Sequence, residues 1–276
     1  MEKFFASIIE LFDITMPTPE PYGVFHICFV IISALSCFLL CRYFRSPSDK
    51  TLRKILLVYA IVCIALEIYK QISFTFDISG GAIVSNYQWY AFPFQFCSIP
   101  MYVSLLAALI PSQKFLHGAT SFLATFGVIA GVLVMASPTT VFIDTIGINI
   151  QTMIHHGGQI TLGLYLLIRG GACKTLGAEL GGIGFFLSAV ATALMLDFTV
   201  IRFIPEGTTF DMFFLSPYFD TTLPVYVNIE PHVSFPLFVF LYVFPFITVS
   251  LLLYACRTAI PRLISEHKER KAVKQN

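Results

Sequence analysis

The stretch "VFHICFVIISALSCFLLCRYFR", residues 24–45, decides the fold class, because its uncharged and largely apolar run continues unbroken up to Arg42. A helix of about 20 apolar residues spans the ~30 Å hydrocarbon core of a bilayer. The whole chain is 57% hydrophobic and 12% charged, whereas soluble domains carry about 25% charged residues. These patterns predict an all-α polytopic membrane protein and argue against a β-barrel, which would show alternating segments of about ten residues.

Similar runs recur along the chain and predict seven transmembrane helices, at residues 22–44, 53–76, 90–110, 115–136, 150–168, 181–204 and 233–256. We expect three parts: an N-terminal segment (1–21), the seven-helix transmembrane domain (22–256) and a basic cytoplasmic tail (257–276). The start, "MEKFFASIIELFDI", lacks the features of a signal peptide and places its Phe and Ile residues on one helical face. It predicts a short helix that lies in the membrane interface or packs on the rim of the bundle.

The positions of the basic residues predict the orientation of the chain. The first, third and fifth connections between spans, with their flanks, and the C-terminal tail hold fourteen of the 17 Lys and Arg residues, whereas the other four non-spanning segments hold Lys3 alone. Because cytoplasmic loops retain Lys and Arg, we expect the N-terminus outside and the C-terminus in the cytoplasm. The outer segment 205–232 is long and rich in Phe and Tyr, which predicts either a lid that dips into the interface or a loop packed over the helix ends.

The seven cysteines indicate no disulfide framework and no zinc site. They are Cys28, Cys37, Cys41, Cys63, Cys97, Cys173 and Cys256. The predicted topology places none of them in an outer loop, and no Cys or His spacing matches a zinc motif. We therefore expect no metal, no cofactor and no nucleic-acid partner. Most of these cysteines have apolar neighbours in the sequence, and we interpret them as small hydrophobic packing residues. Cys97 is the exception, because Gln95 and Ser98 lie close to it in the sequence.

Polar side chains of four predicted spans converge in the outer half of the bundle, where counting 1.5 Å per residue places them at similar depth. They are Glu67, Lys70, Gln71, Gln95, Cys97, Ser98, His155, His156, Gln159 and Asp197, with Arg202 nearer the rim. A charge in a span costs roughly 2.5–3.5 kcal/mol on insertion scales, so such residues usually face the protein interior and serve a function. The inner half is expected to hold few polar groups.

Three features of this layer have alternative interpretations. Glu67 and Lys70 lie three residues apart and can form an ion pair, and Asp197 can pair with Lys70 or Arg202. Such pairs would either serve a site or only pin helices together. His155 and His156 differ by about 100° around their helix, so one of them is expected to be a packing group.

The segment "FPFQFCSIP", residues 92–100, supplies the parts of a nucleophilic site. Pro93 can begin a helix, which would leave the three following N–H groups partly free near Cys97. Pro100 would free the Phe96 carbonyl, and such irregular backbone is tolerated in a membrane only where it is buried or lines a cavity. A thiol, a histidine and spare backbone donors are the components of a nucleophile, base and oxyanion hole.

Three stretches together carry a resemblance to a known family. "FPFQFCSIP", "IHHGGQITLGLYLL" and "GTTFDMFFLSPY" resemble the YwaF-like integral membrane proteins related to transmembrane protein 164, over roughly residues 25–255. The family's usual Leu-Pro-(x)-(His)-Cys-Ser reads here as Phe-Pro-Phe-Gln-Phe-Cys-Ser, and Thr209-Phe210 stands where an Asn-Tyr pair is expected. The resemblance implies an acyltransferase that acts on phospholipids, in which a membrane-embedded Cys forms a thioester and a His acts as base. It assigns Cys97 as the nucleophile and His156, which Gly157 follows, as the base, with His155 in reserve.

These observations predict a lipid acyltransferase or acyl-ester hydrolase that works through a cysteine thioester. Its partner would be a membrane phospholipid or acyl lipid, in a bacterial cell membrane. The supporting residues would be Gln95, Ser98, Gln159, Glu67, Lys70, Asp197 and Arg202. The alternatives are a transporter for a small polar solute, whose path the charged residues and the histidines would line, and a membrane sensor or assembly factor without catalytic activity.

Overall fold

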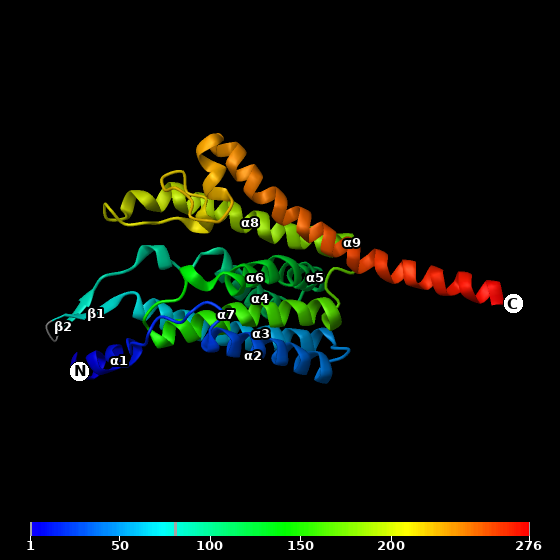
Figure 1. Ribbon diagram of the computed structural model, residues 1–276, viewed down its shortest axis with the longest axis horizontal. Coiled ribbons are helices and arrows are strands. Elements are labelled where there is room, and N and C mark those ends of the chain that lie inside the picture. The colour runs from blue at the N-terminus through cyan, green and yellow to red at the C-terminus, as the bar shows by residue number, and fades with distance from the viewer. Residues whose placement is uncertain (1, 80–81, 276) are drawn as a thin grey trace.

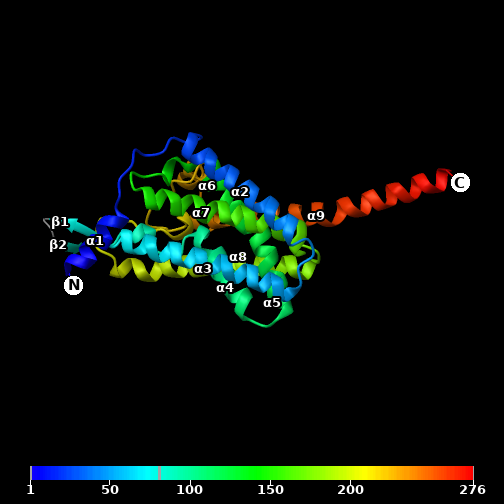
Figure 2. The ribbon, with the colours of Figure 1, turned by 90° about the horizontal axis from the view of Figure 1, so that it is seen from below.

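The computed structural model describes residues 2–79 and 82–275 and is a bundle of long helices that run side by side (Figures 1 and 2). Its α-helices are α1 (Glu2–Phe12), α2 (Val24–Tyr43), α3 (Asp49–Ser73), α4 (Ile99–Leu109), α5 (Gln113–Phe122), α6 (Val128–Ala136), α7 (Ile146–Tyr165), α8 (Leu176–Val200) and α9 (Phe235–Gln275). The strands β1 (Phe76–Ser79) and β2 (Ala82–Ser85) form an antiparallel hairpin, with Phe76 opposite Ser85. The all-α prediction is therefore confirmed apart from this hairpin, which the sequence reasoning missed.

Within the described residues, six helical segments are long and apolar enough to cross a membrane. They are Val24–Tyr43, Asp49–Ser73, Trp89–Leu109, Gln113–Ala136, Leu176–Phe203 and Phe235–Ala259. Each corresponds to one predicted span. The remaining predicted span, 150–168, coincides with α7, a helix of 20 residues. Helix α7 is long enough to cross a membrane, but its mean hydropathy is lower than that of the six candidate spans, because it carries buried polar side chains along its length.

Helix α7 occupies the interior of the bundle, where it contacts α2, α3 and α6. Two glycines allow these contacts to be close. A Cβ added at Gly131 of α6 would lie 2.7 Å from the His156 carbonyl oxygen, and one at Gly157 would lie 2.2 Å from the Ser33 hydroxyl of α2. Contacts this close are typical of small residues at helix interfaces in membranes.

Two π-helical turns interrupt the regular helices. Leu123–Gly127 joins α5 to α6 within one continuous helical segment, and Leu166–Gly170 extends α7. The second turn ends at Gly171, whose φ of 79° is the left-handed conformation that glycine adopts without strain. Helix α9 does not end with the last predicted span. It continues as one helix to Gln275 and leaves the bundle (Figure 1).

One end of the bundle carries the β-hairpin, and we call it the hairpin end; the α2–α3 loop lies at the opposite end (Figure 1). The predicted N-terminal helix is confirmed as α1 and packs beside α3 here. The Tyr69 hydroxyl donates to the Phe12 carbonyl at 2.9 Å, and the two rings meet edge to face at 4.9 Å. Thr15 forms a β-bridge with Thr145. These contacts fit packing on the rim of the bundle.

Candidate functional site

The backbone around Cys97 is irregular, as the prolines suggest, but the helix begins later than predicted. Residues 92–95 are not helical, a short 3₁₀ turn covers Phe96–Ser98, and α4 follows from Ile99. The prediction that Pro93 begins the helix is therefore wrong. Pro100 lies at the start of α4 and frees no carbonyl, because the Phe96 oxygen accepts the Ile99 N–H. A proline is favourable there, since the N–H groups of a first turn have no intrahelical acceptor.

Two α7 side chains converge on the backbone of Cys97. The Cys97 carbonyl oxygen accepts hydrogen bonds from His155 Nε2 at 2.9 Å and from Gln159 Nε2 at 2.7 Å. His155 and Gln159 lie four residues apart and therefore share one face of the helix. Both side chains are 2% exposed, whereas Cys97 is half-buried. The predicted meeting of the Cys97 segment with the polar face of 150–168 is thus present in the fold.

The hydrogen bonds assign the tautomers of the two histidines. A carbonyl only accepts, so the ring nitrogen that faces one must carry the proton. His155 Nε2 faces the Cys97 carbonyl, and His156 Nδ1 faces the Thr152 carbonyl at 2.7 Å. In the neutral rings, His155 Nδ1 and His156 Nε2 are then bare acceptors, and neither has a partner in the described structure. Each ring therefore leaves one buried nitrogen lone pair unpartnered among the described residues.

Within the described part of the chain, no hydrogen bond joins the Cys97 sulfur to either imidazole; the bonded contact runs through the Cys97 carbonyl. The two imidazole rings lie 5.4 Å apart between centroids and are nearly perpendicular. The hydroxyl of Ser98, the residue after Cys97, is buried and has no hydrogen-bond partner among the described residues. The site therefore combines a half-buried thiol with several buried polar atoms that have no hydrogen-bond partner among the described residues.

The ion pair predicted on α3 is confirmed and lies beside this site. Lys70 Nζ is 2.8 Å from Glu67 Oε1, and the Gln71 amide donates to the same oxygen at 2.8 Å. The pair is close enough to interact electrostatically with both Cys97 and His155. Glu67 is 5% exposed. A charged pair held in the bundle interior is thus available to a reacting group at Cys97.

Gln95 and Asp197 both bind the loop 205–232, and Asp197 does not form its predicted ion pair. The Gln95 amide donates to the Asp211 carbonyl at 2.8 Å, and its oxygen accepts the Phe213 N–H at 3.1 Å. Asp197 Oδ1 accepts the Met212 N–H at 2.8 Å. Asp197 forms no ion pair with Lys70 or Arg202 in the described structure, and Arg202 is exposed. These three predicted site residues thus lie outside the contacts made at Cys97.

The loop itself packs tightly over the Cys97 segment. Phe213 is fully buried with a φ of 62°, and its ring lies 5.4 Å from that of Phe96 and 6.1 Å from that of Phe94. A bulky residue at positive φ is strained and persists only where its surroundings fix it. Gln95 and Asp197 supply that fixation from two different spans. Of the two predicted roles for the loop, the contacts favour a packed cover.

The model of the TMEM164 family matches residues 21–256 of the chain. The chain belongs to the TMEM164 family. The match leaves out α1 and the far part of α9 and includes every predicted site residue. No curated protein and no solved structure matches the chain. As a member of the TMEM164 family, the protein is an integral multi-pass membrane protein, as the sequence predicts.

Sequence reasoning missed two buried acids of this TMEM164-family protein. Asp211 is 8% exposed and accepts the Ser216 N–H at 2.8 Å. Burial raises the pKa of Asp211 to about 7, and the nearby Glu230 adds to the effect. The only sequence signal was a single Asp within the apolar stretch "TTFDMFFL".

The second missed acid is Glu179, at the opposite end of the bundle. It is fully buried and accepts a hydrogen bond from the Ser250 hydroxyl of α9. The buried Ser121 lies nearby, since its hydroxyl accepts the N–H of Cys173, which interacts with Glu179. The expectation that this half of the bundle holds few polar groups is therefore wrong. Among the described residues, no group of three or more His, Cys, Asp or Glu could hold a metal ion.

Proposed function

We propose that this TMEM164-family protein is a membrane-embedded lipid acyltransferase or acyl-ester hydrolase that works through a thioester on Cys97. One observation carries the proposal: His155 and Gln159 of α7 both bind the Cys97 carbonyl, so the buried histidine pair is fixed beside a half-buried thiol. The Glu67–Lys70 pair adds fixed charge next to the same group. The resemblance noted from the sequence implies the same nucleophile.

In the proposed reaction, a histidine takes the Cys97 proton, and the thiolate attacks the ester carbonyl carbon of a phospholipid. A carbon–sulfur bond forms, the ester carbon–oxygen bond breaks, and the imidazolium protonates the departing lysolipid alkoxide. The thioester is then attacked by the hydroxyl of an acceptor lipid in transfer, or by water in hydrolysis. The same imidazole takes the attacking proton and returns it to the leaving thiolate.

The candidate bases are His156 through Nε2, as the resemblance implies, and His155 through Nδ1. Both nitrogens lack a partner among the described residues. His155 also donates to the Cys97 carbonyl, which suits a positioning residue. We therefore assign His156 as the base and His155 and Gln159 as the residues that orient Cys97.

The proposed oxyanion donors are the N–H groups of Phe96 and Cys97. They open the Phe96–Ser98 turn, where the first N–H groups have no intrahelical acceptor. Phe94 is no longer a candidate, since its N–H donates to the Phe92 carbonyl at 2.7 Å. Gln95 is unsuited to the role because both ends of its amide bind the loop 205–232.

For the membrane arrangement, we propose that α7 with its π turn is a seventh span, with the N-terminus outside and the C-terminus in the cytoplasm. Helix α7 lies between candidate spans and has their length, and its polar side chains are buried within the bundle. The charge asymmetry of the connecting segments supports this orientation. The hairpin end, with Cys97, would then face the exoplasmic leaflet of a cell membrane.

The test is an assay of acyl release and transfer from phospholipid by purified protein in bilayers. We expect Cys97→Ala to lower the rate at least about a thousandfold, because the variant has no thiol to form the thioester intermediate. The matched control is Cys63→Ala, which removes a buried thiol of α3. Equal rates for wild type and Cys97→Ala would refute the proposal.

The second candidate is a transporter of a small polar solute, and the buried Glu179 favours it. With Glu179 and Ser250 at one end and the Glu67–Lys70 pair towards the other, buried polar groups occur in both halves of the bundle. A flux assay in sealed vesicles tests this candidate. Solute flux that persists in Cys97→Ala and is lost in Glu179→Gln would favour transport over acyl transfer.

A further inference from the structure

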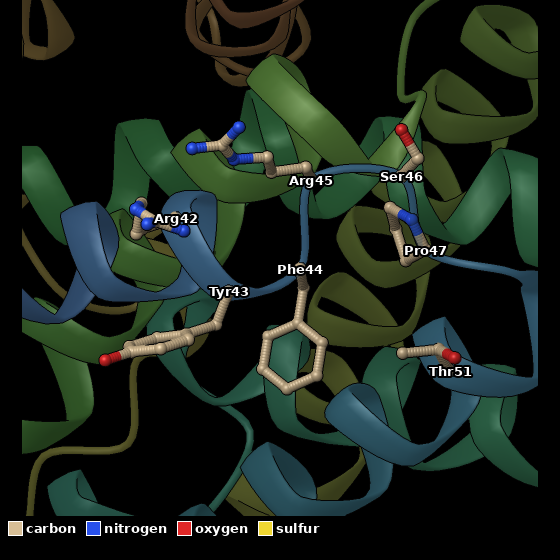
Figure 3. Close-up of a pocket in the computed structure, with 7 residues that line it drawn as sticks. All are labelled: Arg42, Tyr43, Phe44, Arg45, Ser46, Pro47 and Thr51. Atoms are coloured by element: carbon tan, nitrogen blue, oxygen red, sulfur yellow. The ribbon is translucent and has the colours of Figure 1, made fainter.

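A pocket of about 560 Å³ lies at the opposite end of the bundle from the hairpin, where the chain passes from α2 to α3 (Figure 3). It is lined by Arg42, Tyr43, Phe44, Arg45, Ser46, Pro47 and Thr51. At 1.5 Å per residue, the 19 residues of α3 from Thr51 to Lys70 place it about 28 Å from the charged pair beside Cys97. The pocket is therefore separate from the proposed active site.

Two cations line this pocket, and none of the described lining residues supplies a counter-charge. Figure 3 shows the Arg45 side chain extending from the loop toward the end of α2 that carries Arg42. Neither guanidinium forms an ion pair or a hydrogen bond within the described residues. Arg53 behaves differently. It donates to the carbonyls of Ala107 and Ser112, at 2.5 and 2.9 Å, and so caps the end of α4.

The other lining groups fit an anion as well. The Ser46 hydroxyl and the Thr51 hydroxyl, which lies 3.0 Å from that of Ser48, add hydrogen-bonding groups, and no carboxylate is among the described residues that line the pocket. The nearest acid in sequence, Asp49, accepts a hydrogen bond from Gln113 of α5 at 3.0 Å. Guanidinium groups bind phosphate in bidentate geometry, with charge-assisted hydrogen bonds about twice as strong as neutral ones. Phosphate is therefore the chemistry that this pocket would recognise.

The position of the pocket indicates a lipid as the source of that phosphate. It joins the ends of two candidate spans, which is the level of the phospholipid headgroups. Tyr43 is 74% exposed and Phe44 40% exposed, as expected of aromatic side chains at a membrane interface. A neighbouring hollow of about 320 Å³ is lined by Lys50 and Lys54 together with the apolar Leu57. This mixture of charged and apolar lining suits the part of a lipid where the headgroup meets the acyl chains.

We propose that the pocket between α2 and α3 binds the phosphate of an anionic phospholipid headgroup through Arg42 and Arg45. Native mass spectrometry of the delipidated full-length protein, titrated with phosphatidylglycerol and with phosphatidylcholine, tests the proposal. We expect Arg42→Gln/Arg45→Gln to weaken phosphatidylglycerol binding roughly tenfold or more, the effect of losing hydrogen bonds to a charged group. Phosphatidylcholine binding should not change.

The matched control is Lys114→Gln/Lys174→Gln, which removes two exposed cations from the same end of the bundle but outside the pocket. It should leave phosphatidylglycerol binding unchanged. An equal loss in both double variants would mean diffuse surface charge and would overturn the proposal, as would no loss in the arginine variant. Displacement of bound phosphatidylglycerol by excess inorganic phosphate would instead assign the pocket to free phosphate and overturn the lipid assignment.

Discussion

The backbone oxygen of Cys97 is the atom on which the account of the site depends. Two side chains of α7 bind it, and the His156 ring lies 5.4 Å from that of His155, with one nitrogen of each ring unpartnered among the described residues. The His155 hydrogen bond is made to the Cys97 carbonyl and not to the sulfur. In the proposed mechanism, orienting Cys97 and accepting its proton are therefore tasks of two different histidines. The chemical role of each imidazole is therefore testable with variants that retain one nitrogen and remove the other.

We predict that His156→Gln lowers kcat by about 10²–10⁴, the usual contribution of a general base. His155→Gln should cost about tenfold, because the glutamine amide can still donate to the Cys97 carbonyl while the Nδ1 acceptor is lost. Steady-state kinetics of acyl release measure both variants. The reverse order of effects would assign the base to His155.

Asp211 makes the stability of the loop 205–232 depend on pH. Its folded-state pKa of about 7 lies above the ordinary value of 3.8, so the folded chain holds this proton more tightly than the unfolded chain. The resulting stabilisation is complete below about pH 4 and is lost as the pH rises through 7. Asp211→Asn removes the charge and should therefore raise the thermal midpoint more at pH 8 than at pH 5.

Thermal unfolding in detergent at the two pH values measures this effect, with the exposed Asp220→Asn in the same loop as control. The control should shift the midpoint equally little at both pH values. A shift of the Asp211→Asn midpoint that is the same at both pH values would contradict the claim that burial raises the pKa of Asp211.

At the scale of elements, the close approach of α6 to α7 positions the face of α7 that carries His155 and Gln159. Gly131→Ala would place its Cβ 2.7 Å from the His156 carbonyl and 3.1 Å from the Gln159 Cβ, so one of the helices must move. We expect a loss of about 1–3 kcal/mol of stability, the usual cost of overpacking, and lower activity. Thermal unfolding and the acyl-release assay measure the two effects.

Gly184→Ala is the matched control, because a Cβ there meets nothing within 4 Å. It should be neutral or slightly stabilising, since alanine favours a helix over glycine. If both variants behaved alike, the packing of α6 on α7 would not be what positions the site.

The elements that could be predicted are those with a strong local signal. Six apolar runs appear as candidate spans, and the Glu67–Lys70 spacing forms its ion pair, because hydropathy and helical periodicity are local properties. The predicted helix start at Pro93 is too early, since a proline fits both a first helical turn and the irregular segment found here. The partners of Gln95 and Asp197 lie in a loop distant in sequence, and no local pattern encodes such tertiary contacts.

At the scale of the whole molecule, the count of spans fixes which end of the bundle faces which side of the membrane. If α7 crosses, the N- and C-termini lie on opposite sides; with only the six candidate spans, they lie on the same side. We predict opposite sides, with the α9 end in the cytoplasm, from the charge asymmetry. Protease accessibility of a tag at each terminus, in sealed right-side-out vesicles, measures this directly.

Cleavage of the N-terminal tag alone is the expected result. Cleavage of both tags, or of neither, would leave an even number of spans and remove α7 from the list of crossing helices. The Cys97 site would remain in the fold, but its assignment to the exoplasmic leaflet would lose its basis.

The most direct test of the central claim is a search for the acyl-enzyme itself. After incubation with phospholipid, intact and peptide mass spectrometry should find one acyl group on Cys97, released by neutral hydroxylamine as a thioester is and absent from Cys97→Ala. Slower deacylation in His156→Gln should increase its yield relative to turnover. Turnover without any acyl group on Cys97, or with the acyl group on another cysteine, would contradict the account.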